Sequence, residues 1–265
     1  MATTDPDDIL AWKARIEAHL AAIDRSCVSR VQVLDSTPST MDAGAQFAAD
    51  DSSVLVVALS QTNGRGQRGR VWQDADRCTL PCTFVIDVPG INPAMLSAQV
   101  GCAVHDTINQ LIPSSCDLLI KWPNDIVVRQ SEHDFKLAGI LIEQQGDRAL
   151  IGIGINCSQR DDDWGSEIRP DAISLAQIGV QIARVDLLCL LIERLSRWLA
   201  THDRETIIGY YQSNDAMINT RRSFQYDNQQ YNGVVENINP LDSILVKTRA
   251  GSCRLPIGQT QHLRD

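Results

Sequence analysis

The sequence predicts an α/β (α+β) protein, in which helices cover a mixed sheet and a small all-β barrel follows. Apolar helical stripes and β-rich runs alternate irregularly up to Tyr211, which is typical of a mixed sheet with helices packed on it. Beyond that residue only short strand-like runs separated by turn sequences remain. The 265 residues, of which 43% are hydrophobic, suffice for a large core. We therefore expect two domains, over residues 1–215 and 216–265.

The first elements follow from periodicity and from residue type. A helix is predicted over 7–24, because its apolar residues form one stripe and its acidic start suits a helix N-terminus. The stripe consists of Ile9, Trp12, Ile16, Leu20 and Ile23. β-branched and aromatic residues predict strands over 30–35, 54–60 and 79–88.

The middle of the chain continues this alternation. Asn92 and Pro93 suit the cap and first position of a helix through Ile112. Strands are predicted over 117–121, 137–144 and 149–155, and a long helix begins near Asp186. A linker at 213–216 then precedes the expected barrel strands, which lie at 222–226, 231–238, 243–248 and 252–257.

Charge and cysteine usage exclude several classes of protein. The net charge of −9 provides no general basic surface for nucleic acid or a membrane. The acidic N-terminus and the lack of a long apolar run predict a cytoplasmic protein. About 30 residues before the first strand are too few for a DNA-binding domain. The eight cysteines predict buried free thiols, with a zinc site at Cys78 and Cys82 as a minor alternative.

The stretch from Gln61 to Trp72, QTNGRGQRGRVW, fits the G-x-G-x-x-G template for nucleotide binding. A dinucleotide site would need a helix after the last glycine, whereas polar turn residues and a strand follow here. Walker A and kinase elements are missing from the sequence as well. The stretch is therefore interpreted as a loop that presents arginines to a carboxylate or phosphate, or else as a solvated hairpin tip.

Two further stretches carry polar residues at strand ends. KWPNDI at 121–126 follows a buried strand, and its carboxylate beside a lysine could hold Mg²⁺ on a nucleotide or simply form a turn. KLAGILIE at 136–143 places Gly139 inside a strand, where a missing side chain permits close approach of another group.

Together with DSTPST at 35–40 and IGIGIN at 151–156, these stretches resemble the biotin protein ligase family over about residues 30–265. The resemblance implies a class II synthetase-like catalytic domain with an SH3-like barrel and without an N-terminal DNA-binding domain. It also implies that biotin and MgATP form biotinyl-5'-adenylate, from which biotin passes to a lysine of a biotin carrier domain. The expected partner is the carrier domain of acetyl-CoA carboxylase or a related carboxylase. The resemblance leaves a homodimer open.

The resemblance assigns roles to individual residues. Catalysis would fall to Lys136, Arg65 and Lys121. Biotin would contact Ser36, Thr37, Pro38, Gln61, Gly64, Arg65, Gly66, Gln67, Lys136 and Gly139. Nucleotide would contact Arg68, Trp72, Asn124, Asp125 and Asn156, with Asp125 as the magnesium ligand.

Two positions depart from the family pattern. Pro38 stands where the family often has asparagine, and Gln67 replaces the middle arginine of G-R-G-R-R-G-R. Structural alternatives also stay open, because Ser36 and Thr37 could cap a helix and Trp72 could belong to the core. Two other functions remain open as well, namely a lipoate or octanoate ligase and a biotin-adenylate-binding protein with little transfer activity.

Overall fold

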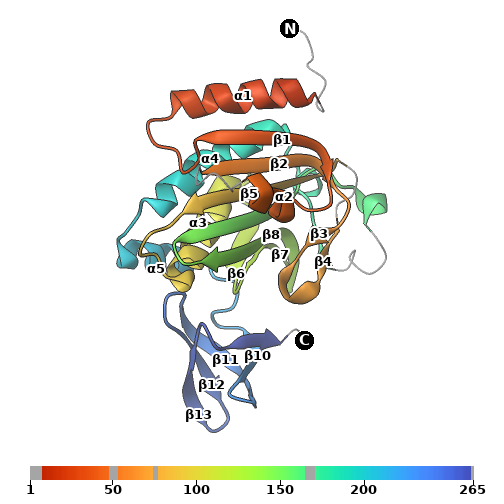
Figure 1. The fold of residues 1–265 in the computed structure, drawn as a ribbon. Helices are drawn as coiled ribbons and strands as arrows, with labels where there is room; N and C mark the ends of the chain where they lie inside the picture. The colour runs from red at the N-terminus through yellow and green to blue at the C-terminus, as the bar shows by residue number, and fades with distance from the viewer. Residues whose placement is uncertain (1–7, 48–52, 74–76, 165–170, 264–265) are drawn as a thin grey trace.

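The computed structural model describes residues 8–47, 53–73, 77–164 and 171–263 (Figure 1). Its largest element is a seven-stranded sheet with the strand order β1-β2-β5-β9-β8-β7-β6. The strands are β1 (Arg30–Thr37), β2 (Val54–Gln61), β5 (Thr79–Asp87), β6 (Asp117–Lys121), β7 (Asp125–Gln130), β8 (His133–Gln145) and β9 (Arg148–Asn156). Only β1 and β2 pair in parallel among them, so the predicted mixed sheet is confirmed.

Helices lie on both faces of this sheet. They are α1 (Ile9–Ala22), α2 (Thr40–Phe47), α3 (Pro93–Asn109), α4 (Arg184–Leu199) and α5 (Arg204–Ser213). Val54 and Val56 of β2 pack with Ala43 of α2, whereas Leu55 and Val57 join the main core. Because side chains alternate along a strand, α2 covers the face opposite to that main core.

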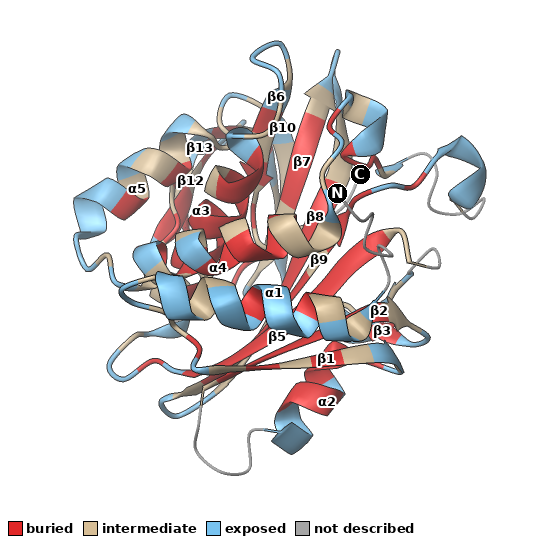
Figure 2. Ribbon diagram, turned by 90° about the horizontal axis from the view of Figure 1, so that it is seen from above, coloured by how far each residue is buried: buried red, intermediate tan, exposed pale blue. Residues whose placement is uncertain are grey.

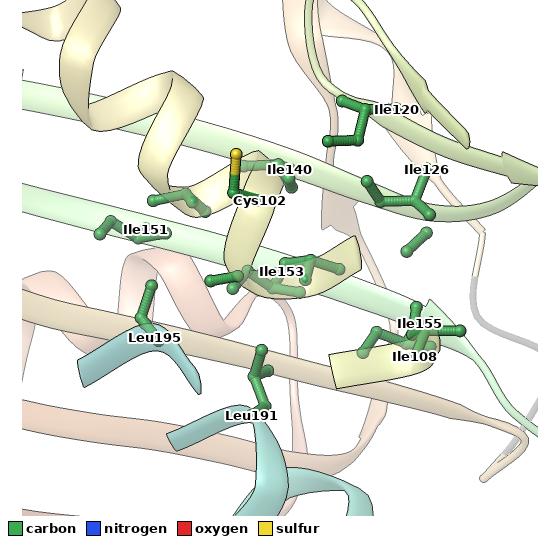
Figure 3. Close-up of a cluster of buried hydrophobic side chains, with 14 of the residues drawn as sticks. Cys102, Ile108, Ile120, Ile126, Ile140, Ile151, Ile153, Ile155, Leu191 and Leu195 are labelled. Atoms are coloured by element: carbon green, nitrogen blue, oxygen red, sulfur yellow. The ribbon is translucent and has the colours of Figure 1, made fainter. Parts of the chain in front are cut away.

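The main core joins α3 and α4 to the centre of the sheet. Figure 3 shows Cys102 of α3 and Leu195 of α4 beside isoleucines of β8 and β9, among them Ile153. Figure 2 shows that buried residues follow the central strands, while α1 and α5 expose much of their length. Three of the helices begin with side-chain caps, where Asp8 accepts from Leu10 N at 2.9 Å, Asn92 from Met95 N at 2.9 Å and Asp203 from Glu205 N at 3.2 Å.

A five-stranded antiparallel sheet follows α5, with the order β13-β12-β11-β10-β14. Its strands are β10 (Arg221–Tyr226), β11 (Gln229–Asn239), β12 (Ser243–Thr248), β13 (Gly251–Pro256) and β14 (Gln261–Leu263). The small all-β unit is thus confirmed. Within the described chain, however, no pairing of β13 with β14 closes it into a barrel.

The segment 213–216, expected to be a linker, is instead hydrogen-bonded to the large sheet. Ile120 N donates to Asn214 O at 2.7 Å, and Ala216 N donates to Ile120 O at 2.9 Å. Phe224 of β10 and Trp122 lie in one core, with ring centroids 6.4 Å apart. The boundary near residue 215 therefore remains a prediction. Over the described ranges, no helix has both the length and the apolar character needed to cross a membrane.

Candidate functional site

A cleft lies between the N-terminal end of α2, a short hairpin and the strands β8 and β9. The hairpin consists of β3 (Gly64–Arg65), a 3₁₀ turn (Gln67–Gly69) and β4 (Val71–Trp72), and Figure 1 shows it beside the large sheet. The cleft is lined by Ser39, Thr40, Met41, Gln61, Arg65, Gly66, Gln67, Trp72, Cys82, Asn124, Lys136, Gly139, Ile140, Leu141, Gly152, Ile153 and Gly154. It therefore gathers residues from all five stretches identified in the sequence.

Two neighbouring glycines leave part of the sheet inside this cleft without side chains. Gly139 of β8 and Gly154 of β9 are cross-strand partners. The Trp72 indole lies on them, since a Cβ added at Gly139 would be 2.7 Å from Trp72 Cζ3 and one at Gly154 would be 2.6 Å from Cε2. The close approach predicted at Gly139 is thus made, in this structure, by the indole.

The cationic part of the cleft centres on Lys136. Its Nζ lies 2.6 Å from Asp125 Oδ1 and 5.3 Å from the centroid of the Trp72 ring. The backbone of Lys136 is held separately, because Asn156 Nδ2 donates to Lys136 O at 3.1 Å and to Ile173 O at 3.1 Å. Asp125 therefore holds the Lys136 ammonium at the cleft, while Asn156 holds the backbone of β8 at the same residue.

Arg65 adds a second cation from the hairpin. Its Nη1 lies 2.9 Å from Asp42 Oδ1, and its Nη2 contacts the Glu143 carboxylate. The side chain of Arg65 is 39% exposed, so both partners can be exchanged for another anion. Arg68 lies at the exposed tip of the hairpin, where its φ of 59° turns the chain back.

The opposite part of the cleft is polar and uncharged. Gln61 Oε1 accepts from Thr40 N at 2.7 Å and from Thr40 Oγ1 at 3.0 Å. Thr83 Oγ1 in turn donates to Thr40 Oγ1 at 2.9 Å. Thr40 and Thr83 are buried, so this network fixes the Gln61 amide with matched hydrogen bonds.

Cys82 contributes an apolar wall to the cleft. Burial raises the pKa of the Cys82 thiol far above its ordinary value, and the neighbouring Cys157 raises it further. A thiol in this state is neutral and behaves as a small hydrophobic group. Across the residues described, no group of three His, Cys, Asp or Glu side chains is placed to hold a metal ion.

Ser36, Thr37 and Pro38 lie just before the residues that line the cleft, and their contact with biotin stays a prediction. β1 continues through Thr37, whose carbonyl accepts from Thr62 N at 3.0 Å. The chain reaches the cleft only where α2 begins, with Ser39 and Thr40. The second Ser-Thr pair of DSTPST could have indicated these cleft residues, because serine and threonine are typical of the first turn of a helix.

Lys121 is not among the residues that line the cleft, and its catalytic role stays a prediction. Its Nζ lies 3.2 Å from Asp134 Oδ2, on a carboxylate that is 4% exposed. Asn156 turns its amide toward backbone carbonyls, and Asn124 lines the cleft while donating to Ile140 O at 2.9 Å. The sequence analysis missed Ser39, Thr40 and Met41, which line the cleft, and it missed Asp42 and Glu143, which contact Arg65.

Comparisons with known proteins identify relatives of this chain. Residues 30–159 match the model of the biotin/lipoate A/B protein ligase family. A biotin–[acetyl-CoA-carboxylase] ligase of Mycobacterium tuberculosis is 36% identical over 149 residues, which are 55% of this chain and 53% of that protein. The chain thus spans about half the length of that relative.

A second relative matches over more of its length. The bifunctional ligase/repressor BirA of Bacillus spizizenii is 30% identical over 230 residues, which cover 83% of this chain and 69% of that protein. The fold resembles a biotin protein ligase from Aquifex aeolicus solved with biotin and ATP, with a TM-score of 0.75 and 23% identity over 89% of this chain and 99% of that one. The chain therefore belongs to the biotin/lipoate A/B protein ligase family.

Proposed function

We propose that this chain is an ATP-dependent biotin protein ligase, which forms biotinyl-5'-adenylate and transfers biotin to a lysine of a carrier domain. The observation that carries the proposal is the convergence of two cations and a buried neutral polar network in one cleft. Curated relatives are named for ligation of biotin to acetyl-CoA carboxylase, and a structural neighbour was solved with biotinyl-5-AMP. The substrates are therefore biotin, ATP and a carboxylase carrier domain.

The two parts of the cleft suit the two ends of biotin. The ureido ring is neutral and polar, so it requires fixed donors and acceptors, which Thr40, Gln61 and Ser39 supply. The valerate carboxylate requires cations, which Lys136 and Arg65 supply. Gly66 and Gln67 of the hairpin would cover the bound acid.

In the first step a carboxylate oxygen of biotin attacks the α-phosphorus of ATP, and the bond to pyrophosphate breaks. Two anions must meet, so the ammonium of Lys136 and the guanidinium of Arg65 lower the barrier by electrostatic stabilisation. Arg65 must exchange Asp42 and Glu143 for the incoming anion, which its exposed position allows.

Magnesium would enter with the nucleotide. Mg²⁺ in such sites is held by phosphates and one or two carboxylates, and it neutralises the charge of the departing pyrophosphate. Asp125, with a side chain 14% exposed, fits as one such ligand, although it bonds Lys136 in this structure. Asn124 lines the cleft on the same turn and would contact the nucleotide.

In the second step the amine of the carrier lysine attacks the acyl carbon of the adenylate. The amide bond forms, AMP leaves and the amine loses a proton. Since the adenylate is a mixed anhydride, the protein needs only to hold it, exclude water and admit the lysine.

Purified protein with MgATP tests the proposal against its alternatives. We expect biotin, and not lipoate or octanoate, to drive exchange of labelled pyrophosphate into ATP, and we expect biotin to appear on a carrier lysine. Exchange driven by lipoate would identify the other activity of the family. Exchange without labelling of the carrier would identify an adenylate-binding protein.

A further inference from the structure

We propose that Asp134 is a positioning residue for Lys136, which acts by holding Lys121 away from Asp125. The inference rests on the proposed function only for the role of Lys136. It begins from five charged side chains on one face of three adjacent strands, β6, β7 and β8. They are Lys121, Asp125, Arg129, Asp134 and Lys136.

Asp134 is the most buried of these charges. Its side chain is 4% exposed and contacts cations from three strands, at 3.2 Å to Lys121 Nζ, 2.8 Å to Arg129 Nε and 3.1 Å to Arg222 Nη2. Burial would raise the pKa of Asp134, but the hydrogen bond and charge of Arg129 and the charge of Lys121 outweigh it, so the pKa lies below its ordinary value. The carboxylate is therefore charged, and it competes strongly for these cations.

Lys121 has a second anion within reach. Lys121 and Asp125 are direct partners across the β6–β7 hairpin. Side chains at such positions have Cβ atoms about 5 Å apart, which a lysine side chain spans easily. In the structure the ammonium of Lys121 nevertheless turns to Asp134, at 3.2 Å. Asp125 is thereby left to Lys136, which it contacts at 2.6 Å.

Removal of the Asp134 charge therefore has a specific consequence. The two arginines retain other interactions, since Arg129 Nη2 donates to Ala216 O at 2.6 Å and the charges of Arg129 and Arg222 also act on Asp215. Lys121 would turn to Asp125, and Lys136 would have to share that carboxylate or leave it. A displacement of about 1 Å in a catalytic group can cost about 100-fold in rate. The ureido end of biotin at Thr40 and Gln61 would keep its contacts, so biotin affinity would fall only through the weakened contact between Lys136 and the carboxylate.

Asp134→Asn, Lys121→Met and the double variant test this competition. We expect Asp134→Asn to lower kcat for biotin-dependent pyrophosphate exchange at least about tenfold, with a smaller rise in KM for biotin. The double variant should regain the rate of Lys121→Met alone, because the competitor is gone. A wild-type rate in Asp134→Asn, or a double variant no faster than Asp134→Asn, would overturn the proposal, since lost packing is not repaired by a second deletion.

Arg222→Gln is the matched control. It removes another partner of Asp134 but leaves Lys121 engaged, so exchange should stay within about threefold of the wild type. A loss of exchange as large as that of Asp134→Asn would show that any disruption of the ion pairs around Asp134 explains the effect, and it would overturn the proposal. If Asp134→Asn does not fold, Asp134→Ser with and without Lys121→Met provides the same comparison, because serine also removes the charge.

A ligand-free measurement separates this inference from the proposed function. Trace labelling of lysines with an amine-reactive reagent, quantified by mass spectrometry, reports how firmly the Lys136 ammonium is held. We expect faster labelling of Lys136 in Asp134→Asn and the wild-type rate in the double variant. Wild-type protein without biotin-dependent exchange would refute the proposed function alone, whereas unchanged Lys136 labelling in Asp134→Asn would refute the role of Asp134.

Discussion

Gly154→Ala should displace the indole of Trp72 and so damage the cleft without unfolding the protein. The added Cβ would lie 2.6 Å from Trp72 Cε2 and 2.7 Å from Cζ2. Ordinary carbon contacts are about 3.5–4.0 Å, so the two groups must separate by about 1 Å. The hairpin that carries Trp72 has only two-residue strands, while Gly154 lies inside the sheet, so the hairpin moves. Overpacking of this kind costs about 1–3 kcal/mol.

Thermal unfolding and biotin-dependent pyrophosphate exchange measure the two effects. We expect a melting temperature lower by several degrees, together with a loss of exchange of about tenfold or more, because the contact between Lys136 and the indole is disturbed. Gly209→Ala is the control, since its Cβ meets nothing within 4 Å on the exposed side of α5. That change should stabilise the protein by up to about 1 kcal/mol and leave exchange intact. Full exchange in a folded Gly154→Ala variant would refute the packing of Trp72 on Gly154.

Three further predictions concern the polar end of the cleft, the hairpin and the join to the C-terminal sheet. Thr40→Val removes a donor to Gln61 and an acceptor for Thr83, so it should raise KM for biotin about tenfold in exchange assays, whereas an unchanged KM would place the ureido ring elsewhere. Gln67→Arg adds a guanidinium group to the cleft and should slow the release of biotinyl-adenylate, as measured by rapid filtration. Equal release rates for the two proteins would mean that residue 67 does not face the phosphate. Burial raises the pKa of Asp215 from its ordinary value near 3.8 to about 6, so ionisation of Asp215 costs stability as the pH rises through this window. Asp215→Asn should therefore raise the free energy of unfolding at pH 8 by at most about 3 kcal/mol and have little effect at pH 3, and equal effects at both pH values would contradict this assignment.

Elements with a clear period or cap were predictable from the sequence. The apolar stripe of α1 and the Asn92-Pro93 start of α3 led to helices close to the observed Ile9–Ala22 and Pro93–Asn109. α5 was missed, because RETIIGYYQS carries few apolar residues and only Ile207 and Tyr211 are buried. β7 was missed because its first residues were interpreted only as a turn with ligand-binding side chains.

The site was predictable in its composition but not in its pairings. Lys136, Arg65, Gln61 and Gly139 lie together as the motifs suggested. The ion pair of Lys121 could not be predicted, because its partner Asp134 lies thirteen positions further along the chain and only the β6–β7–β8 register brings the two together. The partners of Arg65 were likewise invisible, since Asp42 and Glu143 belong to α2 and β8.

The role of Lys136 in forming biotinyl-adenylate is the central claim, and exchange by Lys136→Ala tests it most directly. The Lys136 side chain is 27% exposed at the cleft, so its truncation should leave the fold intact. Loss of a cation that faces charge in the transition state predicts a fall of at least about 100-fold in biotin-dependent pyrophosphate exchange, with an unfolding curve like that of the wild type. Near-normal exchange by the folded variant would contradict the account, because the cleft would then activate biotin without the ammonium at its centre.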